Sequence, residues 1–120
     1  MKQRIFVYGT LKRGGHYSHY LTGQTYLGEA MTEPHYRMVD CGTYPGLYAV
    51  QQNGISIQGE AWVVDSDCRA RLDVLEDVAS GEYEVALVRL LPPYDARDVS
   101  TYIYRLASSV MPDAGDNWKV

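Results

Sequence analysis

The run Tyr8-Gly9-Thr10-Leu11 follows a β-branched and aromatic stretch and leads into Lys12, Arg13 and a glycine pair. A strand that ends in such a turn presents successive backbone N–H groups in one direction, which suits a carboxylate or phosphate. Gly9 lets the backbone approach a ligand, Thr10 adds a hydroxyl, and the two basic residues supply positive charge. The alternative is an ordinary surface turn, because the run lacks the full spacing of a Walker or dinucleotide fingerprint.

A second candidate for chemistry is Glu76, which helical spacing places beside the apolar face set by Leu72 and Leu75. Partial desolvation at such a boundary raises the pKa of a carboxyl from about 4.3 toward the range of a general base. The alternative is a solvated helix carboxylate, which is what we expect of Asp73 and Asp77. Three more glutamates stand in or beside predicted strands, and the sequence selects none of them over Glu76: Glu60, Glu82 and Glu84.

The thiols and imidazoles form no metal pattern. Cys41 and Cys68 lack CxxC spacing, and His16, His19 and His35 give no zinc spacing, so we expect no metal site. Hydrolysis by a cysteine nucleophile is a third possibility, with His35 nearest in sequence to Cys41.

Composition narrows the class of protein and partner. A chain of 120 residues with 46% hydrophobic residues can bury the core of one domain. A net charge of −4 argues against nucleic acid or an anionic membrane as the partner, so we expect a small molecule. The sequence shows no signal peptide and no apolar run of about 20 residues, which predicts a cytoplasmic protein.

Eleven tyrosines stand against one phenylalanine. Buried tyrosine rings need hydrogen-bond partners or a polar cavity, so Tyr44, Tyr83 and Tyr104 are candidate pocket walls. The alternative is that they pack across strands.

These groups must be positioned by a chain that is mostly strand. We expect a turn at Pro45-Gly46, and one helix that is capped by Asp65 or Ser66 and ends at Ser80-Gly81. The predicted strands cover residues 3–8, 26–33, 35–39, 47–50, 57–64, 83–91 and 100–106. This pattern predicts an α+β fold of about six or more strands, either a curled antiparallel or mixed sheet or a small barrel closed from it, with the helix against one side. Residues 1–106 are expected to form the single domain, and residues 107–120 an irregular tail that covers a face through Trp118.

Three blocks of the chain resemble the gamma-glutamylcyclotransferase-like family, and its gamma-glutamylamine cyclotransferase and AIG2-like branch in particular. They are Ile5-Phe6-Val7-Tyr8-Gly9-Thr10-Leu11-Lys12-Arg13-Gly14, then Gly59-Glu60-Ala61-Trp62-Val63-Val64-Asp65, then Leu72-Asp73-Val74-Leu75-Glu76 followed by Tyr83. The blocks occur in order and the resemblance runs to about Leu106.

The resemblance implies a small mixed β-barrel with flanking helices and a pocket between the loop and a catalytic glutamate. Tyr8, Gly9, Thr10 and Leu11 match the substrate-binding loop, Tyr83 matches a further substrate-binding position, and Glu76 matches the acid/base. In such enzymes the α-amine of a γ-glutamyl compound attacks its own γ-carbonyl, which releases an amine or amino acid and leaves 5-oxoproline. No cofactor is needed.

One position departs from the family pattern. Relatives often carry an arginine two residues after the tyrosine matched by Tyr83, whereas Val85 stands there and the next arginine is Arg89. The loss of a guanidinium could alter substrate choice. The competing hypothesis is a binding module that captures a small carboxylate or an acidic partner without turnover, although a bare Glu76 carboxylate facing an anion disfavours simple binding.

Overall fold

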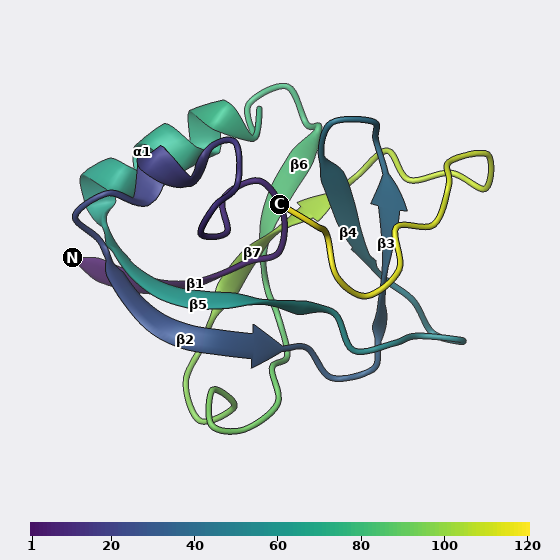
Figure 1. The fold of residues 1–120 in the computed structure, drawn as a ribbon, viewed down its shortest axis with the longest axis horizontal. Coiled ribbons are helices and arrows are strands. Elements are labelled where there is room, and N and C mark those ends of the chain that lie inside the picture. Colours follow the sequence, from purple (N-terminus) through teal and green to yellow (C-terminus); the bar gives the residue numbers. More distant parts are fainter.

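The computed structural model describes residues 1–120 and contains seven strands, one α-helix and one short 3-10 helix (Figure 1). In chain order these are β1 (Lys2–Val7), η1 (Ser18–Leu21), β2 (Thr25–Met31), β3 (Tyr36–Asp40), β4 (Pro45–Ala49), β5 (Gln58–Asp65), α1 (Ser66–Leu75), β6 (Tyr83–Leu87) and β7 (Ser100–Tyr104).

The strands form one mixed sheet in the order β2-β5-β1-β7-β4-β3, and β6 pairs with β7 outside this path. β1 runs antiparallel to β5 over its whole length, from Lys2 opposite Asp65 to Val7 opposite Glu60. β7 joins the two halves through parallel pairing, to β1 at Ser100 and to β4 at Ile103. The loop that follows β1 is therefore held near the centre of the sheet.

The sheet is not closed, because β2 and β3 lie at its two ends. The α+β class with one main helix is confirmed, and the sheet has seven strands, but the expected closed barrel is not confirmed. Closure requires hydrogen bonds between the first and last strands, and β2 and β3 do not pair.

The second half of β1 is buried on both faces. Ile5 and Val7 belong to a cluster of 12 buried residues that includes Leu72 of α1. Phe6 and Tyr8 alternate with them and belong to a second cluster of 11 buried residues. Successive side chains of a strand point to opposite faces, and each buried apolar side chain stabilises the fold by about 1.5–3 kcal/mol. Both clusters thus fix the strand that leads into the loop.

α1 ends earlier than the sequence predicts. Asp65 caps its start, because the Asp65 Oδ1 accepts a hydrogen bond from the Cys68 backbone N–H at 2.8 Å. The helix ends at Leu75 rather than at Ser80-Gly81, and Glu76 is its C-cap. Asp77 takes a left-handed backbone with φ of 54°, which an α-helix cannot continue. Glu76 therefore stands where the chain turns away from the helix.

Pro45 and Gly46 are also placed differently from the sequence prediction, since both belong to β4. The turn lies just before them, where the Cys41 N–H donates to the Tyr44 carbonyl at 2.9 Å. Residues 105–120 contain no helix and no strand, and Trp118 packs against the second core cluster. None of the helices has the length and apolar character needed to cross a membrane.

Candidate active site

The loop after β1 is shaped by its own backbone. The Lys12 N–H donates to the Gly9 carbonyl at 3.0 Å, and the Tyr17 N–H donates to the Thr10 carbonyl at 2.9 Å. The N–H groups of Gly9, Thr10 and Leu11 donate to no acceptor in the protein. Three successive free amides are the arrangement that binds an anionic or carbonyl oxygen.

Gly9 is required by packing. A Cβ atom there would lie 2.6 Å from the Cγ of Pro45, so only a residue without a side chain lets β4 approach the loop. The sequence predicts that Gly9 lets a ligand approach the backbone. The structure adds a second reason, which no local sequence signal reveals because Pro45 is distant in the chain.

Glu76 lies against the loop. It lines a small cavity of about 30 Å³ together with the loop residues Gly9, Thr10 and Leu11 and with Tyr83. Burial and, to a smaller extent, the neighbouring charge of Glu82 together raise the pKa of the Glu76 carboxyl to about 7. Near neutral pH a carboxyl of this kind is poised to both accept and donate a proton.

A larger cleft of about 660 Å³ opens beside the small cavity. Four residues line both spaces, namely Thr10, Tyr44, Glu76 and Tyr83. The remaining lining residues of the cleft include Glu82, His16 and Lys119. An elongated molecule with one polar end in the cavity would therefore pass Glu76 and continue into the cleft.

The hydroxyls of Tyr8 and Tyr83 beside the cavity form hydrogen bonds within the protein. Tyr8 donates to the Tyr102 carbonyl at 2.7 Å and accepts from the Leu47 N–H at 3.1 Å, and burial raises its pKa well above the ordinary value. Tyr83 donates to the Pro45 carbonyl at 2.7 Å, and burial raises its pKa as well. These rings serve as walls of the cavity.

Tyr44 and Tyr104, the other two predicted wall residues, differ in their placement. Tyr44 lines both spaces and donates to the Glu82 Oε2 at 2.7 Å. Tyr104 packs on Tyr83 with ring centroids 5.2 Å apart and lines neither space. Two functional neighbours were missed by sequence reasoning, Glu82 as a charge beside Glu76 and Pro45 as the residue that packs on Gly9.

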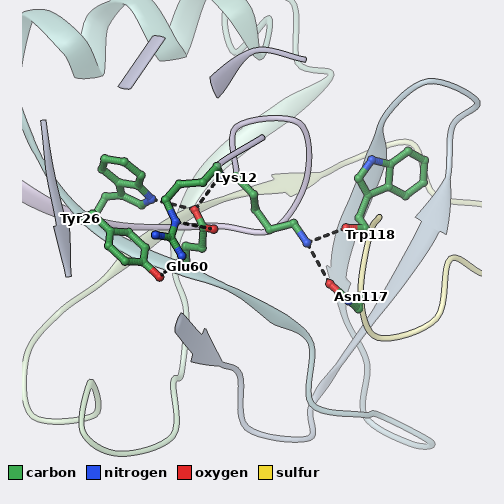
Figure 2. A network of polar contacts seen from close by, with 7 residues as sticks. Lys12, Tyr26, Glu60, Asn117 and Trp118 are labelled. Atoms are coloured by element: carbon green, nitrogen blue, oxygen red, sulfur yellow. Dashed lines mark hydrogen bonds and ion pairs between the residues drawn. The ribbon is translucent and has the colours of Figure 1, made fainter. Parts of the chain in front are cut away.

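Glu60 is engaged in a separate network, and Figure 2 shows its side chain close to that of Tyr26 from the neighbouring strand β2. Its Oε1 accepts from the Arg13 backbone N–H at 3.0 Å and from the Trp62 indole at 3.1 Å. The Arg13 guanidinium stacks over the Tyr26 ring at 3.8 Å. Glu60 therefore anchors the far end of the loop, whereas Glu76 is the carboxylate at the cavity.

Two other sequence expectations concern Asp73 and Val85. Asp73 is not a freely solvated carboxylate, because its Oδ1 accepts from the Arg69 Nε at 3.0 Å and from the Tyr102 hydroxyl at 2.7 Å. Val85 is half-buried and packs against the first core cluster, opposite Tyr102 of β7. Neither Arg89 nor any other arginine lines the cavity or the cleft.

No group of three or more His, Cys, Asp and Glu side chains lies close enough together to hold a metal ion.

Comparison with known proteins bears on this site. The family model described as gamma-glutamyl cyclotransferase, AIG2-like, matches residues 5–120. A relative from Vibrio cholerae is 44% identical over 78 residues, and the match covers 65% of this chain and 65% of that protein, just under two thirds. The gamma-glutamylcyclotransferase family protein YtfP of Escherichia coli is 33% identical over 113 residues, 94% of each chain.

The fold is also shared with solved structures. An AIG2-like protein from Mus musculus superimposes with a TM-score of 0.79 at 24% identity, over 93% of this chain and 85% of that chain. The resemblance inferred from three sequence blocks is thus confirmed by a match that spans nearly the whole sequence. The chain belongs to the gamma-glutamyl cyclotransferase, AIG2-like family.

Proposed function

We propose that the protein is an enzyme that cyclises the γ-glutamyl group of a small γ-glutamyl amine or amino acid to 5-oxoproline and releases the amine. The observation that carries this proposal is the juxtaposition of Glu76, whose pKa is raised to about 7, with the free amides of Gly9, Thr10 and Leu11 around one cavity. Family membership supports the same class of reaction.

The substrate supplies its own nucleophile in this reaction, so the protein has to provide proton transfer. The substrate's α-amine attacks its own γ-carbonyl carbon, a C–N bond forms, and the bond to the leaving nitrogen breaks. The attacking nitrogen passes from ammonium to ring N–H and loses two protons, and the leaving nitrogen gains two. Glu76 accepts a proton from the first nitrogen and returns it to the second, which its raised pKa suits.

The loop supplies orientation and electrostatic support. Its amides can hold an oxygen of the substrate, either the carboxylate or the carbonyl oxygen that becomes negative during attack. A folded glutamyl chain held in this way reacts within one molecule, and well-oriented rings reach effective molarities of roughly 10⁵ M or more. The rings of Tyr8 and Tyr83 are walls of the cavity that limit the conformations of the substrate's glutamyl chain.

The substrate is a small molecule in this proposal. We also propose a cytoplasmic location, which is supported by the two free cysteines, Cys41 and Cys68, since thiols persist in a reducing compartment.

The proposal is tested by incubating the purified protein with a panel of γ-glutamyl amines and amino acids, including γ-glutamyl-ε-lysine. Mass spectrometry then follows both 5-oxoproline and the released amine. Appearance of the two products in equal amounts supports the cyclotransferase. Saturable binding with no product across the panel would support the binding module instead.

A further inference from the structure

The C-terminal segment 116–120, here called the strap, is fastened to the body of the protein at successive residues. The Gln58 N–H donates to the Asp116 carbonyl at 2.7 Å. The Lys12 Nζ then donates to the Asn117 Oδ1 at 2.9 Å and to the Trp118 carbonyl at 2.6 Å. Figure 2 shows the lysine side chain reaching from the loop to both acceptors.

Lys12 is an unusual lysine, because only 7% of its surface is exposed. Lysine is seldom buried unless its charge is paired or hydrogen-bonded, and the strap supplies two acceptors. Burial lowers the pKa of the ammonium, while the nearby charge of Glu60 opposes that shift. The same residue also bonds through its backbone to Gly9 of the loop. Lys12 therefore links the strap to the loop that is proposed to hold the substrate.

The strap borders only one of the two spaces at the site. Trp118, Lys119 and Val120 line the larger cleft, and no strap residue lines the small cavity beside the loop amides. Glu76 lines both spaces. A substrate whose glutamyl head reached Glu76 from the small cavity would extend into the cleft, where the strap residues lie.

We propose that Lys12 is a positioning residue that holds the strap as a wall of the leaving-group part of the cleft, so that the strap contacts and selects the leaving amine. This proposal rests on the proposed cyclotransferase function. A contact made equally in the ground state and in the transition state changes KM and leaves kcat unchanged. A role in the folding of the loop alone would affect all substrates alike.

The test compares γ-glutamyl-methylamide with γ-glutamyl-phenylalanine in three variants. Lys12→Met removes the ammonium at similar side-chain length, and Asn117→Ala removes one of its acceptors from an exposed strap residue. Lys2→Met is the matched control, because Lys2 is exposed at the start of β1. For Lys12→Met we expect the KM of the phenylalanine compound to rise about tenfold, with kcat within about twofold and the methylamide little changed. Asn117→Ala should show a smaller change in the same direction.

An equal change of KM for both compounds in Asn117→Ala, or no change in a folded Lys12→Met, would overturn the proposal. If the unaltered protein turns over neither compound, the cyclotransferase proposal fails while the strap remains testable by calorimetry of the same two compounds. Weaker binding of the phenylalanine compound alone in Lys12→Met or Asn117→Ala then supports the strap. The absence of binding by either compound contradicts it.

Discussion

Among single residues, the proposed function depends on one carboxyl group and the charge beside it. Glu76 and Glu82 both line the cleft, and Tyr44 donates to Glu82 and fixes that carboxylate in place. A like charge makes ionisation of Glu76 harder, which adds to the effect of burial. The proton affinity of Glu76 is therefore set partly by a residue outside its own helix.

The pH dependence of activity follows from this pair. Glu76 must be ionised to take the first proton, so kcat/KM should rise with pH through a limb near 7. Glu82→Gln removes the like charge and should move this limb to lower pH, though only in part, because burial is the larger cause. Glu84→Gln is the matched control, because Glu84 is an exposed residue of β6. A limb that moves equally in both variants contradicts the assigned coupling.

The same pKa has a consequence for stability. In the folded protein Glu76 keeps a proton up to about pH 7, whereas an ordinary glutamate releases it near 4.5. The folded state therefore loses stability relative to the unfolded chain as pH rises from about 4.5 to 7. Glu76→Gln should gain up to about 3 kcal/mol over the unaltered protein between pH 4 and pH 8. Urea unfolding at both pH values measures this, and a constant difference would refute it.

The sequence predicts the residues of the candidate site but not the contacts that support them. Glu76 and the loop could be predicted because they stand in short, ordered blocks. The burial of Lys12 could not, because its acceptors Asn117 and Trp118 lie more than 100 positions along the chain. The hydrogen bond that Asp73 accepts from Tyr102 could not be predicted either, because Tyr102 comes from a distant strand.

At the scale of elements, the site depends on how closely β4 approaches the loop after β1. Pro45 packs on Gly9, and its carbonyl accepts the Tyr83 hydroxyl. The sequence predicts a bend at Pro45-Gly46 from local turn propensity. The structure places both residues in β4, with Gly46 so close to Tyr104 that a Cβ would lie 2.4 Å from its ring. Packing between strands overrides the local preference.

Gly9→Ala tests this close approach. The added methyl group should push the loop and β4 apart, destabilise the fold by about 1–3 kcal/mol and lower activity. Pro45→Ala alone should have a smaller effect, and the double variant should recover part of the loss, because the clash is removed. Thermal unfolding and activity of the four proteins form the cycle. Strict additivity would show that the two residues do not meet.

The residue at which α1 ends could not be predicted from the sequence either. The apolar spacing continues to Ala79, so periodicity favours a helix to Ser80-Gly81. The backbone of Asp77 turns left-handed instead, and the chain leaves the helix just after Glu76. The apolar pattern reports which residues face the core and does not report where the hydrogen-bond ladder stops.

At the scale of the whole molecule, two halves of an open sheet meet around one tyrosine. β7 pairs with β1 and β4 through only short parallel stretches, at Ile5 with Ser100 and at Leu47 with Ile103. Tyr8 reinforces this junction by hydrogen bonds to both β7 and β4. The sequence predicted the strands and the helix, but the order of the strands and the open edges depend on pairings between distant segments.

Tyr8→Phe should therefore destabilise the whole fold. The change leaves the Leu47 N–H without its acceptor, which costs about 1–3 kcal/mol for a buried group. Tyr48→Phe, at the residue that follows Leu47 in β4, is the control, because it removes a half-buried hydroxyl that forms neither of the two junction bonds. Chemical denaturation measures the difference. Equal stability of the two variants would contradict the role of Tyr8 in stabilising this junction.

The most direct measurement for the whole account is 5-oxoproline formation by the unaltered protein and by Glu76→Gln, side by side, on the best compound of the γ-glutamyl panel. We predict that 5-oxoproline and amine appear together with the unaltered protein. Glu76→Gln should be folded and about 10²–10⁴-fold slower, the range for loss of a general acid/base. Full activity of Glu76→Gln would contradict the role of Glu76, and the absence of 5-oxoproline from every compound would contradict the cyclotransferase itself.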